Sequence, residues 1–357
     1  MKLQGNKIGI CFGTYAPLHQ GHLDVIFRAK KECDGVIVIV CGFDGDRGEK
    51  AGIPLNERFK CIKEFFRSDP LVKVHCISDS ELGLAPYPNG WKKWLEEFER
   101  LYNLTTDVKE RLWYVGEEDY KYQLELRSEK AILLDRSENP ISATLIRNNP
   151  LKYWNYITHP FKKYFSTNIL ITGTASEGKS TLVEDLGKYF NTVFSYEWAK
   201  KYIMTYGLDE RELTERHFLN FLHGQDYLNK KLISSEYNKG IFFSDTDSIV
   251  TKMYAQYYAQ DSRFNISEKD IKNVKWKADE ISASYNWNKI FLITPHGKFV
   301  DDGTRAMEHS DMESRQEIFD LLCSYIKESG NWDKVVILNG TYYENFITIK
   351  NYVKGLV

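Results

Sequence analysis

Two histidines, His19 and His22, lie three residues apart at the start of an expected helix. At this spacing both imidazoles can face one side of the first helical turn. The segment that contains them, Gly13–His22, follows an apolar run and therefore joins a strand to a helix. Backbone N–H groups and the helix dipole favour phosphate at such a junction, and Gly13 and Gly21 would let the backbone come close to it. The pair therefore predicts a site that stabilises negative charge on a polyphosphate.

A second segment, Ile141–Arg147, offers complementary chemistry. It places Ser142, Thr144 and Arg147 at the beginning of another expected helix. Ser142 suits the N-cap position, and Arg147 comes round on a neighbouring face. Hydroxyls and a cation suit the β- and γ-phosphates of ATP; taken alone, the segment is equally typical of a capped helix. Three further charged residues could clamp phosphate or simply be solvated: Asp44, Arg47 and Arg58.

The longest motif is Gly173–Ser180, a complete G-x-x-x-x-G-K-[S/T] between an apolar run and an amphipathic stretch. In such a loop the backbone N–H groups cradle phosphates, Lys179 bridges the β- and γ-phosphates, and Ser180 holds Mg²⁺. The motif is typical of small-molecule kinases and of switch or motor ATPases. Its predicted ATP-binding residues are Gly173, Thr174, Ser176, Glu177, Gly178, Lys179, Ser180 and Thr181.

Carboxylates after a later strand favour a kinase. Asp245 and Asp247 follow the apolar run Gly240–Ser244, where they could hold Mg²⁺ or deprotonate a sugar hydroxyl; capping of the next helix is the plainer interpretation. Arg305 and, further along, Arg315 suit a mobile lid that closes over the transferring phosphoryl group. The N-K-x-D motif that reads guanine in switch proteins is absent from the sequence.

Aromatic side chains could hold flat ligands at two places. Trp91 and Trp94, close to Asn89, could stack on a nicotinamide ring, although a tryptophan pair that closes the core is at least as typical. After the P-loop helix, Glu197 could accept a hydrogen bond from a ribose hydroxyl and Trp198 could stack on a base. A plain amphipathic helix would have a similar sequence there.

The elements that must position these residues are short apolar runs alternating with amphipathic stretches. This alternation predicts the α/β class, with two domains that each contain a parallel sheet covered by helices on both faces. We place the domains at 1–150 and 167–357, and expect the ring-rich segment 151–166 to be a packed linker rather than a flexible one. The predicted strands are Lys7–Phe12, Gly35–Cys41, Leu71–Ile77, Trp113–Val115, Asn168–Thr172, Gly240–Ser244, Lys289–Thr294 and Lys334–Leu338, with helices at Gly21–Glu32 and Lys179–Phe190.

The bulk properties exclude several classes of protein. The net charge is −2 and the basic residues are scattered over the 357 residues, so a nucleic-acid partner is not expected. The six cysteines lack metal-ligand spacing and are expected to be reduced thiols. We find no signal peptide and no apolar run of about 20 residues, and therefore expect a cytoplasmic protein without a membrane span. The sequence leaves the oligomeric state open, with a homo-oligomer among the possibilities.

The motifs together resemble a known family. The H-x-G-H and I-S-x-T-x-x-R pair is similar to nucleotidyltransferases that transfer AMP or CMP to a phosphate. Followed by a P-loop kinase, it resembles the bifunctional family that joins nicotinamide mononucleotide (NMN) adenylyltransferase to ribosylnicotinamide kinase. The segments that carry the resemblance are Gly13–His22, Tyr87–Trp94, Gly116–Tyr120, Ile141–Arg147, Gly173–Ser180, Asp245–Asp247 and Asp301–Arg305.

This resemblance implies a Rossmann-like nucleotidyltransferase domain followed by a nucleoside-kinase-like domain, using ATP and Mg²⁺ to make NMN and then NAD. The implied catalytic residues are His19, His22, Lys179, Asp245, Asp247 and Arg305. The implied ligands of the first ATP are Gly13, Thr14, His19, His22, Ser142, Thr144 and Arg147. Those of the nicotinamide nucleotide are Tyr15, Asn89, Trp91 and Trp94, those of the riboside Glu197, Trp198, Asp245 and Asp247, and those of the metal Ser180 and Asp245.

Two departures from the family pattern bear on these expectations. The family's Glu-Tyr-Ala-Arg segment reads Glu197-Trp198-Ala199-Lys200 here, and lysine cannot reproduce the forked contacts of arginine. Some members carry an N-terminal helix-turn-helix repressor domain, whereas few residues precede the first strand here, so repression is not implied. The alternatives are a fused pair of the coenzyme A type and an NAD- or ATP-sensing regulator with degenerate sites. The sequence leaves open whether both activities are retained, whether the kinase prefers ATP or GTP, and whether NMN is channelled.

Overall fold

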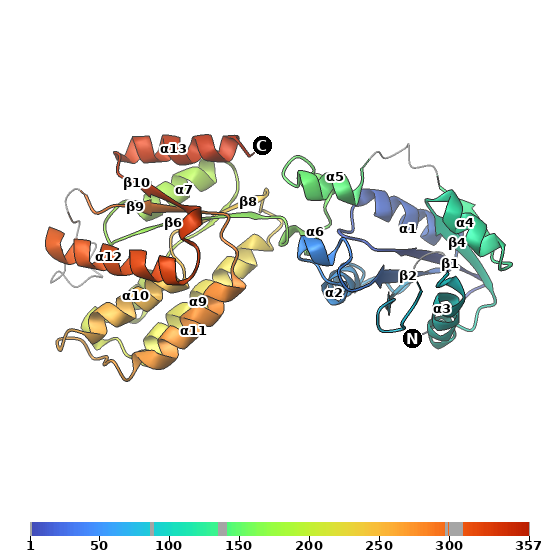
Figure 1. The fold of residues 1–357 in the computed structure, drawn as a ribbon, viewed down its shortest axis with the longest axis horizontal. Helices are drawn as coiled ribbons and strands as arrows, with labels where there is room; N and C mark the ends of the chain where they lie inside the picture. Colours follow the sequence, from blue (N-terminus) through green and yellow to red (C-terminus); the bar gives the residue numbers. More distant parts are fainter. Residues whose placement is uncertain (1, 86–88, 135–140, 297–298, 300–309, 357) are drawn as a thin grey trace. The chain divides into compact units, whose positions relative to one another are not determined.

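The computed structural model describes residues 2–85, 89–134, 141–296, 299 and 310–356. It divides into two compact units, Met1–Phe165 and Ser166–Val357. Each unit contains one five-stranded parallel sheet with helices packed on it, as Figure 1 shows. The predicted α/β fold, with a parallel sheet in each half of the chain, is confirmed.

The sheet of the first unit has the order β3-β2-β1-β4-β5. The chain lays β1, β2 and β3 side by side in one direction and then returns to add β4 and β5 on the other side of β1. The order therefore reverses between β1 and β4, and the carboxyl ends of these strands form the crevice where open parallel sheets bind ligands. The strands are β1 (Lys7–Gly13), β2 (Gly35–Gly42), β3 (Val72–Ser78), β4 (Glu110–Val115) and β5 (Ala131–Leu133).

Alternating side chains of the central strands fill a core on each face of this sheet. Val36, Val38 and Val40 of β2 belong to one buried cluster, together with residues from α1 (Gln20–Glu32), α2 (Leu55–Phe65) and α6 (His159–Lys162). Ile37 and Ile39 belong to a second cluster, which also contains residues from α3 (Trp91–Thr105) and α4 (Glu118–Glu125). Because both faces of β2 are covered, the strand is a continuous apolar run rather than an alternating one.

The segment set apart in the sequence as a linker lies within the first unit up to Phe165. Trp154, Ile157 and Phe161 are buried in the same cluster as α1 and α2. Thr158 contacts the segment Gly13–His22, which we call the histidine loop. Its Oγ1 donates a hydrogen bond to the backbone oxygen of Leu18 at 2.9 Å. Residues 151–165 are therefore packed into the core of the first unit and are bonded to the loop that precedes α1.

The second unit has the strand order β10-β9-β6-β8-β7. One face of its sheet packs on α9, α10 and α12 through a cluster that includes Leu170, Phe242 and Leu292; Figure 1 shows α7 and α13 over the other face. The strands are β6 (Thr167–Gly173), β7 (Val193–Ser195), β8 (Ile241–Ser244), β9 (Lys289–Ile293) and β10 (Val335–Leu338). The helices are α7 (Lys179–Tyr189), α8 (Trp198–Tyr206), α9 (Glu215–Ile233), α10 (Ser248–Ala259), α11 (Ile271–Ser284), α12 (Met312–Glu328) and α13 (Tyr342–Lys354).

All eight predicted strands are present. Their ends differ from the predicted ones by at most one residue, except that β4 begins three residues earlier, at Glu110 rather than Trp113. Two strands, β5 and β7, were not predicted because each has only three residues, too few to show a pattern. All six cysteines are free. Within the described ranges, no helix is both long and apolar enough to cross a membrane.

Candidate active sites

The two histidines meet at the junction of β1 and α1. His19 is the N-cap residue of α1, and its backbone oxygen accepts a hydrogen bond from the backbone N–H of His22 at 2.9 Å. This turn stacks the two imidazoles, with ring centroids 3.8 Å apart and planes inclined by 29°. Tyr15, buried beside them, presents its ring to His22 at 4.9 Å in an edge-on arrangement. The predicted pair thus faces one side of the first turn.

The second predicted segment lies directly against the first. Ser142 caps α5 (Ala143–Asn148), and its Oγ accepts from the backbone N–H of Leu145 at 3.2 Å. Arg147 donates Nη1 to the backbone oxygen of Ala16 at 2.6 Å and Nη2 to Thr144 Oγ1 at 3.0 Å. A single guanidinium therefore links the α5 hydroxyl to the histidine loop.

The two glycines of the histidine loop differ in what they do. A Cβ at Gly21 would lie 3.2 Å from both His19 Cε1 and Ile141 Cγ2, so glycine lets the two motifs pack together. A Cβ at Gly13 would meet only the Tyr15 ring, at an ordinary contact distance of 3.5 Å. The described neighbours of Gly13 therefore leave room for a Cβ, and the predicted close approach of this backbone to phosphate stays a prediction.

A second arginine joins this cluster from the loop after β2. Arg47 donates Nη2 to Thr14 Oγ1 at 3.0 Å. Burial and the nearby positive charge of Arg47 both lower the pKa of Arg147. Two guanidinium groups that repel each other beside two imidazoles form a region that a polyphosphate would neutralise.

Arg58 differs from Arg47, although the sequence grouped them. Its side chain is fully buried and forms a bidentate pair with Asp46, with Nη1–Oδ1 and Nη2–Oδ2 distances of 3.0 and 2.7 Å. Asp46 Oδ1 also accepts from the backbone N–H groups of Gly48 and Glu49. Arg58 is therefore neither a solvated charge nor a phosphate clamp; it fixes the loop that carries Arg47.

Replacement of Arg58 by alanine is expected to lower the free energy of unfolding by about 3–5 kcal/mol, because it leaves the Asp46 carboxylate buried without its partner. Urea unfolding, with hydrogen exchange to assign the loss to the first unit, measures the change. Arg28→Ala is the matched control, since Arg28 forms an exposed i,i+4 pair with Glu32 and such pairs contribute only about 0.3–0.5 kcal/mol. Equal effects of the two variants would contradict this role of Arg58 in the loop.

The tryptophans proposed for the nicotinamide nucleotide belong to the core. Trp91 and Trp94 are 6% and 7% exposed and pack on Phe12 of β1, with ring centroids 5.9 and 5.4 Å away. Tyr120, from the segment that follows β4, joins the same ring cluster. Asn89, just before α3, is exposed, and Tyr87 and Pro88 lie outside the described residues. The pair thus has the core-closing surroundings that the sequence left as the alternative.

The P-loop connects β6 to α7 in the predicted way. Gly173 has φ +147°, and a Cβ there would lie 2.6 Å from the backbone oxygen of Ile293, so only glycine fits. Gly178, with φ +76°, is the N-cap of α7. The Nζ of Lys179 reaches back over the loop to the backbone oxygen of Thr174 at 2.6 Å. This places the ammonium group where the loop's backbone would hold phosphates.

The two aspartates after β8 separate. Asp245 is buried, and its Oδ2 accepts a hydrogen bond from Ser180 Oγ of the P-loop. Asp247 instead caps α10 by accepting from the N–H groups of Ile249 and Val250. Its Oδ2 accepts from Trp287 Nε1 at 3.2 Å, and burial raises its pKa to about 6.

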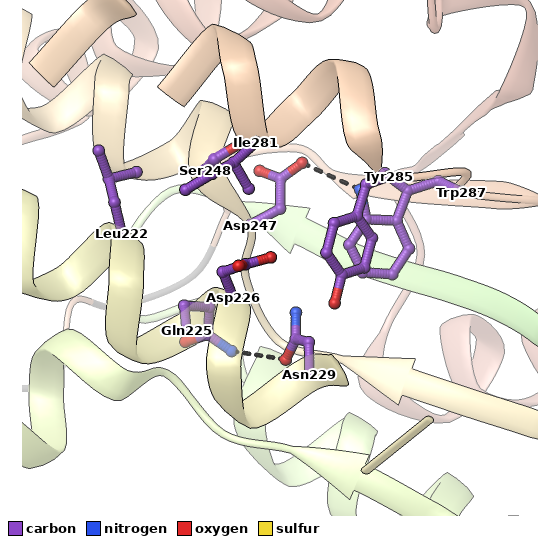
Figure 2. A pocket seen from close by; sticks show the side chains of 9 residues that line it. All are labelled: Leu222, Gln225, Asp226, Asn229, Asp247, Ser248, Ile281, Tyr285 and Trp287. Carbon is purple, nitrogen blue, oxygen red and sulfur yellow. Dashed lines mark hydrogen bonds between the residues drawn. The ribbon is translucent and has the colours of Figure 1, made fainter. Parts of the chain in front are cut away.

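Figure 2 shows where the Asp247 carboxylate lies. It borders a small cavity that Asp226, Asn229 and Tyr285 also line. Among the described residues, the lining of the larger cleft beside the P-loop includes Thr246 but not Asp247. The structure therefore brings Asp245 to the phosphate site and places Asp247 at the next helix, as the plainer interpretation of the sequence had it.

The cleft beside the P-loop has a volume of about 910 Å³, including its open mouth. Lys179 and Thr174 border it at the phosphate end, and Glu197 and Glu210 contribute carboxylates. Burial and the neighbouring Glu210 raise the pKa of Tyr258 well above its usual range. Among the described residues, the aromatic side chains that line the cleft are Phe218, Phe221, Tyr254, Tyr258 and Phe299.

Trp198 packs on a helix rather than on the cleft. A Cβ at Gly224 of α9 would lie 2.0 Å from Trp198 Nε1, so the indole covers that glycine. The backbone N–H of Trp198 donates to Gln225 Oε1 at 2.7 Å. Among the described lining residues, Glu197 and Ala199 border the cleft and Trp198 does not.

The two arginines assigned to a lid also differ. Arg305, with the whole segment Asp301–Arg305, lies outside the described residues. Arg315 belongs to the first turn of α12 and is buried rather than carried on a mobile segment. It nevertheless lines the cleft and pairs with Glu177 of the P-loop.

Comparisons with known proteins agree with this arrangement. A cytidylyltransferase-like family model matches residues 10–149, and an AAA domain model matches residues 168–345. The trifunctional NAD biosynthesis/regulator protein NadR of Escherichia coli is 27% identical over 99% of this chain and 84% of its own length. A crystal structure of NadR protein in complex with NR is 32% identical, with a TM-score of 0.88 over 98% of this chain and 97% of that one. The chain belongs to the NadR family.

A second NadR structure extends the comparison to nucleotides. NadR protein in complex with NAD and AMP-PNP is 33% identical, with a TM-score of 0.86 over 99% of this chain and 97% of that one. The family and the two-domain organisation that the motifs predicted, a nucleotidyltransferase domain followed by a P-loop kinase-like domain, are thereby confirmed.

Several residues of the kinase-like cleft in this NadR-family chain were not predicted from its sequence. Val250, Tyr254 and Tyr258 line it from α10 at intervals of four residues, which is the spacing of one helical face. That spacing, directly after Asp245–Asp247, was a usable signal. Glu210 had no such signal, because it lies in a short turn between α8 and α9 and only the fold brings it to the cleft.

Proposed function

We propose that the second unit phosphorylates the 5′-hydroxyl of ribosylnicotinamide with ATP. The observation that carries this proposal is a P-loop whose Lys179 borders a cleft with aromatic walls and two carboxylates. Backbone N–H groups of the loop and Lys179 hold the triphosphate, and Glu197 accepts the hydrogen bond of a ribose hydroxyl. The rings of the α9 and α10 faces enclose the flat base and exclude water from the phosphoryl group.

Mg²⁺ fits beside this loop. A hydroxyl and a carboxylate, Ser180 Oγ and Asp245 Oδ2, point at each other there, and oxygen donors of this kind are those that Mg²⁺ prefers. Both residues would hold the ion, which neutralises charge on the phosphates when it is bound. Asp247 is left out of this set because it caps α10.

We propose that the first unit transfers AMP from a second ATP to NMN, which yields NAD and pyrophosphate. His19 and His22 donate hydrogen bonds to the phosphates, while Arg47, Thr144 and Arg147 hold the departing pyrophosphate. No covalent intermediate is needed, since the phosphate of NMN attacks the α-phosphorus in line and the protein supplies position and positive charge. NMN made at one site is then the substrate of the other.

Steady-state assays with two acceptors test both halves of the proposal. Wild-type protein should consume ATP with ribosylnicotinamide and form NMN, and should form NAD from NMN and ATP. Turnover with pantetheine derivatives in place of both acceptors would favour a coenzyme A enzyme. Binding of NAD without turnover of either acceptor would favour a sensor.

A substitution on α9 tests the position of Glu197. Gly224→Ala should raise the KM for ribosylnicotinamide about tenfold and leave the KM for ATP unchanged, because the new methyl group displaces Trp198 and with it the adjoining Glu197. Tyr227→Ala is the control, since Tyr227 lies on the same helix and is 64% exposed. An unchanged riboside KM in Gly224→Ala would argue against a riboside contact at Glu197.

A further inference from the structure

The side chain of Glu177 is wholly buried although it belongs to the phosphate-binding loop. Its carboxylate is 0% exposed, while the residue as a whole is partly exposed, so what it presents to solvent is backbone. Oε1 accepts from Thr174 Oγ1 at 3.2 Å, and both oxygens lie 3.3 Å from the backbone nitrogen of His296, which donates to them. The carboxylate therefore joins the loop to the segment that follows β9.

The third partner of this carboxylate is Arg315 from α12. Arg315 donates Nη2 to Glu177 Oε1 and also, at 3.0 Å, to the backbone oxygen of His296. The guanidinium carbon lies 5.9 Å from the ring centroid of Phe299. Arg315 and Phe299 both line the cleft that Lys179 borders. Because Glu177 belongs to the P-loop, the Glu177–Arg315 pair lies at the phosphate end of this cleft.

Electrostatics explains why the two charges need each other. A free carboxylate in a loop that binds a polyphosphate would repel the ligand, and Arg315 cancels this charge. A buried guanidinium likewise needs an anion or a polar partner. Because the guanidinium is a rigid planar fork, fixing Nη2 on Glu177 and His296 fixes the plane of the whole group.

We propose that Glu177 is a positioning residue for phosphoryl transfer, which holds Arg315 at the phosphate end of the cleft. There the guanidinium of Arg315 meets the charge that is spread over the oxygens of the transferring phosphoryl group. This inference rests on the proposed kinase function of the second unit. It gives the P-loop carboxylate a role that acts through α12 and not on ATP itself.

A double-mutant cycle tests the proposal. Arg315→Ala and Glu177→Ala should each lower kcat for ribosylnicotinamide phosphorylation about 10²-fold. The KM for ATP should change less than about threefold in Glu177→Ala, whereas it should rise in Arg315→Ala, which leaves the Glu177 carboxylate without its cation. The double variant should be no slower than Arg315→Ala alone, because Glu177 acts only through Arg315. Glu177→Gln keeps an acceptor for Thr174 and His296 and should recover about tenfold over Glu177→Ala.

Two further measurements distinguish a positioning role of Glu177 from misfolding of the variants, and do not depend on the choice of kinase substrate. The His296 amide should exchange with solvent about tenfold faster in Glu177→Ala, since its acceptor is removed. NMN adenylylation should be unchanged in every variant. Glu184→Ala is the control: Glu184 lies on α7, next to the loop, in a surface pair with Lys188, so kcat and exchange at His296 should stay at wild-type values.

The opposite results would overturn the proposal. Equal effects of Glu177→Ala with and without Arg315 would show that Glu177 acts independently of it. A rise in the KM for ATP at unchanged kcat would make Glu177 a ligand-binding residue instead. If wild-type protein fails to phosphorylate ribosylnicotinamide, the proposed function is wrong. The same cycle, measured on ATP hydrolysis without an acceptor, and the His296 exchange then still decide the role of Glu177.

Discussion

Alanine at position 179 is expected to lower kcat for ribosylnicotinamide phosphorylation by about 10²–10³-fold, while NMN adenylylation stays at the wild-type rate. The Nζ of Lys179 lies over the loop backbone, bonded to Thr174 O at 2.6 Å, and borders the cleft. Its removal takes away a positive charge aimed at the transferring phosphoryl group. Water cannot replace this charge, because it must reorganise as the reaction proceeds.

Lys188→Ala provides the matched control for this experiment. Lys188 lies on the same helix, is 65% exposed and pairs only across one helical turn with Glu184 among the ion pairs of the described residues. Both rates should therefore be unchanged in it. Separate assays with ribosylnicotinamide and with NMN make the comparison. Equal loss of both activities in Lys179→Ala would mean that the two reactions share one ATP site, contrary to the two motifs.

His22→Ala is expected to have the complementary effect, with NAD formation from NMN slowed about 10²-fold and riboside phosphorylation unchanged. His22 is preferable to His19 for this test because the His19 side chain is buried, at 4% exposure, so its loss would also disturb the packing around the loop. The stacked rings, 3.8 Å apart, present two donors beside Arg147. Removing one leaves the helix N-terminus intact and weakens only the neutralisation of phosphate charge.

The control for this variant is His159→Ala, which removes an exposed imidazole at the start of α6. It should leave NAD formation from NMN at the wild-type rate. A mixture of Lys179→Ala and His22→Ala proteins should convert ribosylnicotinamide to NAD, since each variant retains the step that the other lacks. Full adenylylation activity in His22→Ala would remove the histidine pair from the mechanism.

The sequence was sufficient to predict those parts of the site that consist of the backbone of one continuous segment. The histidine loop and the P-loop each join a strand to a helix, so their chemistry follows from residue order and local geometry. The family followed from both motifs in one chain. Gly173 illustrates the point: its φ of +147° is a conformation that favours glycine, and the motif requires glycine at this position.

The charged and aromatic residues around these loops were less predictable. Arg47 and Arg58 belong to one charged stretch, yet one reaches Thr14 and the other is buried on Asp46. Trp91 and Trp94 had the spacing of a stacking platform but fill the core. Asp245 and Asp247 are two residues apart, and the turn after β8 sends one to Ser180 and the other to Trp287. Composition and spacing are the same whether such a residue lies at the site or serves the core or a helix cap, so they could not distinguish the two.

The two phosphate-binding motifs, their order and the family were thus determined by the sequence alone, because a phosphate cradle is made of consecutive backbone N–H groups. Only the tertiary structure decided which side chains serve those cradles. The burial and pairing of a side chain depend on segments that are distant in the chain. At Glu177, for example, Arg315 of α12 meets His296 of the segment that follows β9. A charge in a sequence has no partner until the fold supplies one. In this chain the partner Asp46 makes Arg58 structural, whereas Arg47 reaches Thr14 beside the histidine pair.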